Sequence, residues 1–227
     1  MAVSIADIQK IRKMTGAGLA DCKKALTDAE GDFDKAVQII REKGQAIAAK
    51  RSDRETSNGC VLVKADNGFS AMIALKCETD FVANGKDFIA LTQSILDAAV
   101  AAKAKTLDEV KALPLNGSTV QDEVIARSGI TGEKTELDGY LYLEGDNVSV
   151  YDHMNKHLLC TMVQTNKPAE EQAHAVAMQV AAMNPVALDE ASVPQEVKDT
   201  ELTVAIEKTK EEQINKAVEG WLQSLHR

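Results

Sequence analysis

Alternating hydrophobic and polar positions define the central stretch of the chain. From Phe69 to Cys77 every second residue is apolar, which predicts a half-buried β-strand ending near Glu78. A helical pattern follows over residues 86–103. We therefore expect the tetrapeptide between them, Asp80-Phe81-Val82-Ala83, to lie on an exposed loop. Phe81 either packs back on the following helix as a hydrophobic staple or contacts something outside the fold.

A second copy of this pattern begins 87 residues further along. Residues 61–81 align with residues 148–168, and each copy predicts a strand, a polar turn, a second strand, a loop and an apolar helix. The loops differ, because the first copy has Thr79-Asp80-Phe81 and four extra loop residues where the second has Asn166-Lys167-Pro168. A scaffold that needs no Phe in one copy favours an external contact for Phe81 in the other.

Three short helices are predicted in the first 45 residues. Ser4 with Asp7 signals the start of the first, residues 19–29 form the second, and Asp32 caps a third that is expected to end at Gly44. The expected inward residues are Ile5, Ile8, Ile11, Phe33, Val37 and Ile40. This arrangement resembles a ubiquitin-associated domain, and the resemblance implies that it binds a partner protein. The alternative is a three-helix module with a purely structural role.

The remaining pattern completes an α+β fold. Residues 46–58 are charged and predict a linker, while helices are expected over residues 106–113, 120–128 and 170–183. A strand over residues 138–143 is expected to join the second hairpin. The core is thus predicted to have two parts, each with antiparallel strands and packed helices.

Residues 194–225 predict one long helix that cannot be buried on its own chain. Its central segment, residues 207–213, has no apolar side chain. The apolar stripe that follows consists of Ile214, Ala217 or Val218, Trp221 or Leu222, and Leu225.

Composition narrows the function classes. A hydrophobic content of 44% with no run of 18 apolar residues predicts a soluble, cytoplasmic protein without a leader or membrane contact. Residues 1–54 carry 11 Lys/Arg and 8 Asp/Glu, so their net charge is +3 and that of the rest is −12. The net negative charge of residues 55–227 argues against direct binding of nucleic acid.

The candidate chemistry is sparse. Four cysteines lie apart without a CxxC motif, and Cys60 and Cys77 are not expected to face each other across the hairpin, so we predict buried thiols. His153 and His157 lack a third ligand nearby, which argues against a metal site. An enzyme would have to use Asp80 with Cys77, and no histidine lies in that loop. We therefore expect no catalytic residue, cofactor or metal. An adaptor built on the first 45 residues is another alternative.

Three sequence blocks carry a resemblance to a known family. They are KMTGAGLADCKKAL at residues 13–26, CETDFVA at residues 77–83 and VAAMNP at residues 180–185. In this order and at these distances they resemble bacterial elongation factor Ts, the guanine-nucleotide exchange factor for the translational GTPase elongation factor Tu. The likeness covers residues 1 to 219.

The resemblance implies a mechanism without bond chemistry. The chain would bind elongation factor Tu in its GDP-bound and nucleotide-free forms, displace magnesium and GDP, and allow GTP loading. Residues Asp80, Phe81, Val82 and Ala83 would enter beside the nucleotide pocket, with Phe81 as a wedge. Asp80 would either hydrogen bond in the interface or compete electrostatically.

The resemblance also implies two further contacts. Arg12, Leu19 and Ala20 match positions where the N-terminal domain touches the GTPase domain, although Leu19-Ala20 is smaller than the Met pair often found there. His153 matches a hairpin position that faces another domain of elongation factor Tu.

The C-terminal region departs from the family pattern. In the family this region is a coiled-coil hairpin that projects from the core and is followed by a segment that returns to the core. In this sequence no segment that would return to the core is evident before Arg227. Three explanations stay open: an incomplete chain, missing internal residues, or a short form whose stripe pairs with a second copy as a homodimer. The expected divisions are 1–45 for the ubiquitin-associated-like domain, 46–58 for the linker, 59–137 and 138–185 for the two core subdomains, and 186–227 for the projecting helix.

Overall fold

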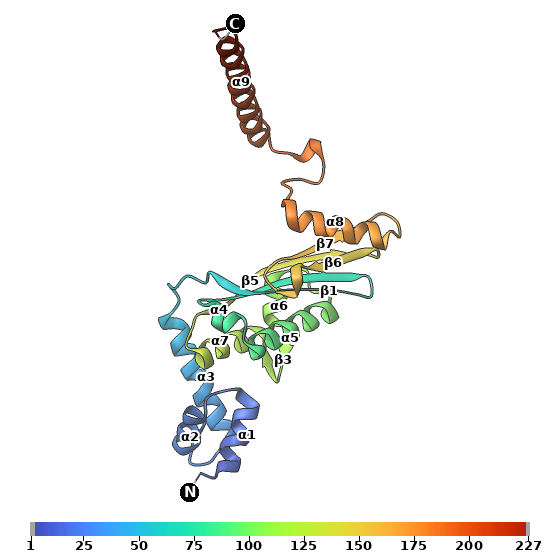
Figure 1. Cartoon of the computed structure of the whole chain (residues 1–227). Coiled ribbons are helices and arrows are strands. Elements are labelled where there is room, and N and C mark those ends of the chain that lie inside the picture. The colour runs from blue at the N-terminus through green and yellow to red at the C-terminus, as the bar shows by residue number, and fades with distance from the viewer. Residues whose placement is uncertain (1–2, 226–227) are drawn as a thin grey trace. The chain divides into compact units, whose positions relative to one another are not determined.

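The computed structural model describes residues 3–225, and their side chains as far as residue 219. The chain divides after Ala182 into two compact units (Figure 1). The first contains an N-terminal helical region and an α+β core, as the sequence predicted. The second contains the C-terminal helix.

Three helices form the N-terminal module: α1 (Ile5–Thr15), α2 (Leu19–Asp28) and α3 (Phe33–Lys50). The predicted caps are confirmed, because Ser4 and Asp7 make a capping box and the Asp32 side chain accepts from the Lys35 N–H at 3.0 Å. The buried hydrophobic cluster of this module consists of Ile11, Ala17, Cys22, Ala25, Leu26, Ala29 and Ala36. The prediction that Ile5 faces inward is wrong, since its side chain in the first turn of α1 is exposed.

The third helix does not end at Gly44, and this part of the prediction is wrong. Helix α3 continues to Lys50, and Gly44 packs against Gly129 of α7 (Val120–Thr131). A methyl group on Gly129 would lie 2.5 Å from the Gly44 Cα atom, so glycine serves close helix packing here. The predicted linker is consequently helical over residues 46–50.

The first sheet has the strand order β1-β2-β5, all antiparallel: β1 (Asn58–Asp66), β2 (Phe69–Cys77) and β5 (Thr135–Glu144). Asn67 and Gly68, both with positive φ, form the tight turn between β1 and β2. The predicted period-two pattern is confirmed, as one face of β2 is buried. Its residues are Phe69, Ala71, Ile73, Leu75 and Cys77.

Strand β5 belongs to this first sheet, so its predicted place in the second hairpin is wrong. It pairs with β2 from Cys77 opposite Thr135 to Phe69 opposite Glu144. Leu137 is buried in the first core, and the Tyr140 hydroxyl donates to the Ala104 carbonyl at 2.6 Å. These contacts with the first core determine which hairpin the strand extends.

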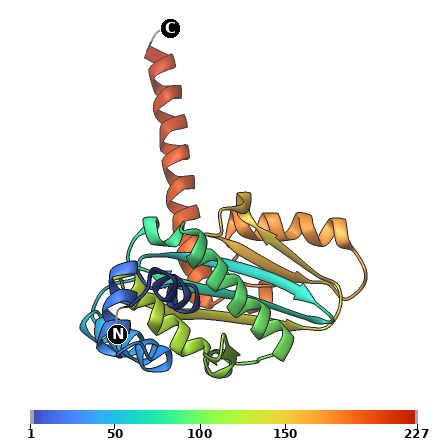
Figure 2. The ribbon, with the colours of Figure 1, turned by 90° about the horizontal axis from the view of Figure 1, so that it is seen from below.

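Helices cover one face of this sheet: α5 (Lys86–Ala102), α6 (Leu107–Ala112) and α7, with the short strands β3 (Pro114–Leu115) and β4 (Ser118–Thr119) between α6 and α7. Figures 1 and 2 show α5, in green, lying along the sheet. Its buried residues include the predicted set of Phe88, Leu91, Ile95 and Ala99. Helix α5, which follows β2 and the segment after it, is thus packed against the sheet from its first turn, where Phe88 is buried.

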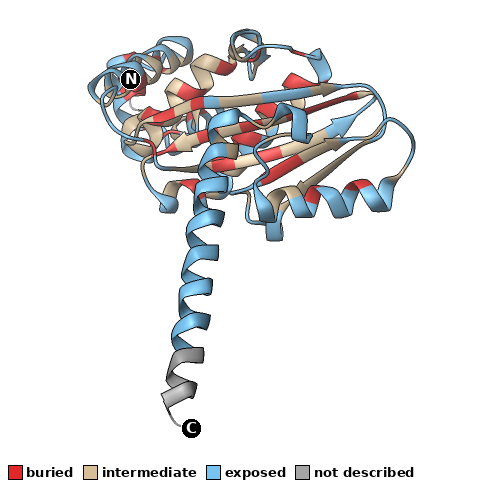
Figure 3. Cartoon of the chain, turned by 90° about the horizontal axis from the view of Figure 1, so that it is seen from above, coloured by how far each residue is buried: buried red, intermediate tan, exposed pale blue. Residues whose placement is uncertain are grey.

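The second hairpin comprises β6 (Val148–Asp152), the 3-10 turn η1 (His153–Asn155) and β7 (Cys160–Gln164), followed by α8 (Glu170–Met183). Both strands and the helix were predicted. The hairpin contacts β1 through a hydrogen bond from the Val61 N–H to the His157 carbonyl at 2.7 Å. Helix α8 covers it, with Ala173 and Ala177 buried (Figure 3).

The second unit contains the short turn η2 (Glu190–Ser192) and helix α9 (Gln195–Leu225). The predicted long helix is confirmed, and Ile214 and Val218 of its stripe are exposed. The side chains of Trp221, Leu222 and Leu225 lie outside the described residues. Among the described helices, none combines the length and hydropathy needed to cross a membrane.

The four cysteines are buried and free. The register places Leu75 opposite Cys60 and Asn58 opposite Cys77, as expected. Burial raises the pKa of Cys60 to about 11 and that of Cys160 to about 12, so both thiols are protonated at neutral pH.

Candidate partner-binding site

The tetrapeptide singled out by the sequence forms a single helical turn, α4 (Asp80–Ala83), between β2 and α5. Thr79 is its N-cap, and its hydroxyl accepts from the Val82 N–H at 3.4 Å. Backbone bonds from Ala83 to Thr79 and from Asn84 to Asp80 close the turn. The expected loop is therefore a compact helical turn.

The two halves of α4 point in opposite directions. Ala83 is buried in the core, and Val82 packs against the same cluster. Asp80 is exposed, and Phe81 has 87% of its surface exposed. Phe81 therefore does not form a hydrophobic staple, and Val82 and Ala83 anchor the turn that presents it.

Side-chain hydrogen bonds hold this turn to two distant segments. The Thr79 N–H and hydroxyl donate to the two oxygens of Glu133, at 3.1 and 2.7 Å. One residue earlier, Glu78 accepts from the Lys134 N–H at 2.6 Å and from Arg51 Nη1 at 2.8 and 2.9 Å. The Lys134 N–H, followed by Arg51, holds the pKa of Glu78 below its usual value, so Glu78 is ionised at neutral pH.

Sequence reasoning missed Arg51, Glu78 and Glu133. Arg51 was assigned to a linker and Glu78 to the end of a strand. Glu133 follows α7 in the sequence, and only the pairing of β5 with β2 brings it to Thr79. No local pattern marks such a contact.

The predicted N-terminal contact residues lie around the connection between α1 and α2. Arg12 and Ala20 are exposed, and Leu19 exposes about half of its surface. Gly16, with φ of 68°, ends α1 and turns the chain, while Ile11 and Ala17 anchor the connection in the core. Met14, which the sequence analysis did not select, is also exposed there.

His153 begins the turn η1, on an element separate from α4 and from the N-terminal module. Its Nδ1 atom shares a hydrogen bond of 3.0 Å with the Tyr151 hydroxyl. Met154 and Leu158 of the same connection are exposed and were missed because the sequence predicted only a polar turn. His157 pairs instead with Asp152, at 2.5 Å.

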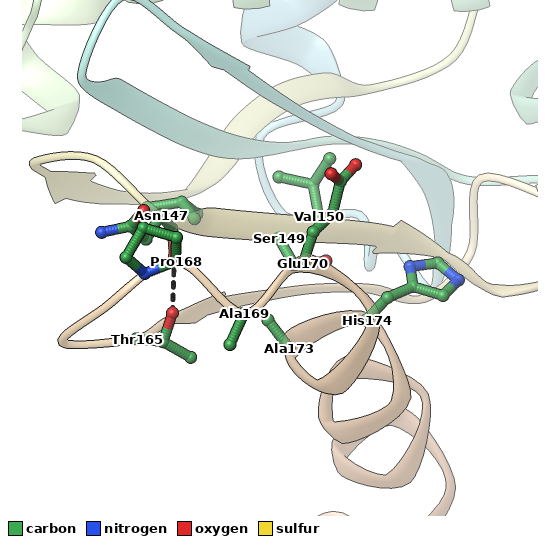
Figure 4. A pocket seen from close by; sticks show the side chains of 10 residues that line it. Asn147, Ser149, Val150, Thr165, Pro168, Ala169, Glu170, Ala173 and His174 are labelled. Carbon is green, nitrogen blue, oxygen red and sulfur yellow. Dashed lines mark hydrogen bonds between the residues drawn. The ribbon is translucent and has the colours of Figure 1, made fainter.

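A hollow of about 470 Å³ lies between β6 and the start of α8 (Figure 4). Thr165 closes one end, where its hydroxyl bonds to the Asn147 carbonyl at 3.3 Å. The Glu170 carboxylate and the His174 ring point in different directions, so they do not make an acid–base pair in this arrangement. None of the predicted contact residues lines this hollow.

The structure does not place Cys77 as an accessible nucleophile beside Asp80. Burial, followed by the nearby Glu133 carboxylate, raises the pKa of Cys77 to about 11. Cys77 is also fully buried, whereas Asp80 faces outward. A protonated thiol that solvent cannot reach does not act as a nucleophile.

Comparison with known proteins identifies the family. A family model described as elongation factor TS matches residues 78–226. Elongation factor Ts of Parabacteroides distasonis is 65% identical over 222 residues, covering 98% of this chain and 68% of the relative. The proteins of that name from Bacteroides fragilis and Porphyromonas gingivalis are 67% identical over 223 residues and 51% identical over 213 residues, with 98% and 93% of this chain and 68% and 77% of the relatives covered. The chain therefore belongs to the elongation factor Ts family, the nucleotide exchange factors that act on elongation factor Tu in translation elongation.

Proposed function

We propose that Asp80 and Phe81 enter elongation factor Tu beside its nucleotide pocket, displace magnesium and GDP, and so allow GTP to load. The observation that carries this proposal is the exposure of Phe81, at 87%, on a turn in which the two residues that follow it, Val82 and Ala83, pack against the core. The chain contributes a preformed apolar group and breaks no covalent bond. It binds both the GDP-bound and the nucleotide-free partner, because exchange passes through both.

The energy available from Phe81 is sufficient for a substantial effect. Burying a Phe side chain stabilises a complex by about 1.5 to 3 kcal/mol, which corresponds to roughly a tenfold to hundredfold change in affinity. Loss of magnesium adds to this, because the ion is the main countercharge of the diphosphate. Coupling is reciprocal, so arriving GTP weakens the hold of the exchange factor in turn.

Two further surfaces support the same complex. Arg12, Leu19 and Ala20 of the N-terminal module dock on the GTPase domain of elongation factor Tu. His153 in the second hairpin contacts another domain. Their exposure on separate elements fits a partner held at several points.

We also propose that the stripe on α9 pairs with a second copy. Ile214 and Val218 lie four residues apart, on one helix face, and both are exposed. A homodimer would cover them.

The decisive experiment measures release of a fluorescent GDP analogue from elongation factor Tu with the full chain. The intact chain is expected to accelerate release, and Phe81→Ala to lose most of that acceleration. Leu202→Ala, at an exposed apolar position of α9, is the matched control and should keep the full rate. Equal rates for the intact chain and Phe81→Ala would contradict the wedge. If neither accelerates release, a pull-down with elongation factor Tu tests whether the chain binds at all.

A further inference from the structure

Glu78 and Thr79, the residues between β2 and α4, stay paired with the segment that precedes β5 through hydrogen bonds to side chains. The backbone ladder between β2 and β5 ends at the pair Cys77 and Thr135. Beyond it, Glu78 and Thr79 still lie beside Lys134 and Glu133, and hydrogen bonds to side chains replace the ladder. The pairing therefore extends two residues past the last ladder pair, as far as the first residue before α4.

These bonds are reciprocal, which makes the arrangement specific. Thr79 donates two hydrogen bonds to the Glu133 carboxylate, and the Lys134 N–H donates one to the Glu78 carboxylate. Hydrogen bonds to an ionised acceptor are stronger than neutral ones. Thr79 is also the N-cap of α4, so Glu133 fixes the residue from which the direction of the turn is set.

The end of α3 supplies the third support. Arg51 follows directly on α3 and contacts both oxygens of Glu78, whose side chain is 17% exposed. Helix α3 is itself packed tightly on α7 at Gly44 and Gly129. The turn is thus held from the N-terminal module on one side and from the connection between α7 and β5 on the other.

We propose that Glu133 and Glu78 are positioning residues that fix the direction in which Phe81 leaves the surface. This inference rests on the proposed role of Phe81. Neither carboxylate has to touch the partner, because both act through Thr79 and the start of α4. Without them, α4 keeps its anchors Val82 and Ala83 but Phe81 samples several directions, and fewer encounters insert it correctly.

The test combines Glu133→Ala with Phe81→Ala in the assay of GDP release. Glu133→Ala alone should slow stimulated release by roughly threefold to thirtyfold, within the range of coupling between contacting groups. In the Phe81→Ala background it should have no further effect, because there is no ring left to direct. Asp138→Ala removes the ion pair between Asp138 on β5 and Lys76 on β2, and as the matched control it should leave release unchanged.

If Glu133 and Phe81 contribute to GDP release independently, the double variant gives a different result. If Glu133→Ala slowed release by the same factor with and without Phe81, or not at all, the positioning role would be wrong. If Glu133→Ala failed to fold, Thr79→Val would remove the hydroxyl bond to Glu133 from the other side, and Thr79→Ser should keep release at the parent rate because serine keeps the hydroxyl. If Phe81→Ala alone still accelerated GDP release as fast as the parent chain, the proposed function itself would be wrong.

Discussion

Phe81 and Phe88 provide a direct test of how the site is built, because they are the same residue type seven positions apart with opposite environments. Phe81 is 87% exposed and Phe88 is 2% exposed. A fully buried aromatic side chain covers about 150 to 250 Å². About an eighth of that area is covered at Phe81, which corresponds to less than about 1 kcal/mol at 25 cal/mol per Å².

Phe81→Ala should therefore change the free energy of unfolding by less than about 1 kcal/mol, whereas Phe88→Ala should lower it by about 3 to 5 kcal/mol. Urea unfolding followed by circular dichroism measures both, and an unchanged m-value shows that the same transition is compared. A loss near 2 kcal/mol or more for Phe81→Ala would refute the reasoning. It would mean that the ring packs on its own chain and is not free for a partner.

Two further substitutions test the contacts around the site. Glu78→Gln should lower stability by about 1 to 2 kcal/mol at pH 7, because the charge facing Arg51 is lost. The folded-state pKa of Glu78 lies below its ordinary value, so its contribution to stability is present above that ordinary value and is lost as the pH falls through the folded-state pKa. The free energies of unfolding of parent and variant should thus converge as the pH falls through the folded-state pKa of Glu78; a gap that stays constant with pH would contradict this. Gly129→Ala should cost about 1 to 3 kcal/mol through the clash with Gly44, measured by urea unfolding, and an unchanged midpoint would argue against close packing of α3 on α7.

Local signals predicted the strand and helix that frame the site. The alternation in β2 and the helical face of α5 each involve residues a few positions apart, so the pattern of apolar residues was sufficient. The exposure of Phe81 was anticipated from composition and from the unequal loops of the two hairpins. The helical form of α4 was not, because a single turn is too short to carry a periodic signal.

Errors arose where distant segments decide the structure. Gly44 suggested a helix end, but a glycine also permits close packing, and only the presence of Gly129 on α7 distinguishes the two. The strand near residue 138 precedes the second hairpin in the sequence, yet its buried Leu137 belongs to the first core. The support of the site by Glu133 depends on that same pairing and was missed with it.

The third strand explains why the two hairpins treat their final loops differently. The two residues that precede β5, Glu133 and Lys134, lie beside the end of β2 and bond to Thr79 and Glu78 at the start of α4. In the described residues β7 pairs only with β6, and Thr165 bonds instead to the carbonyls of Asn147 and Lys167, which closes the loop on itself before Pro168. An exposed Phe held in a fixed direction requires support from outside its own loop, and only the first hairpin has a neighbouring strand placed to give it. The same duplicated plan therefore yields one loop that closes on itself before a helix and one that leaves a Phe side chain exposed.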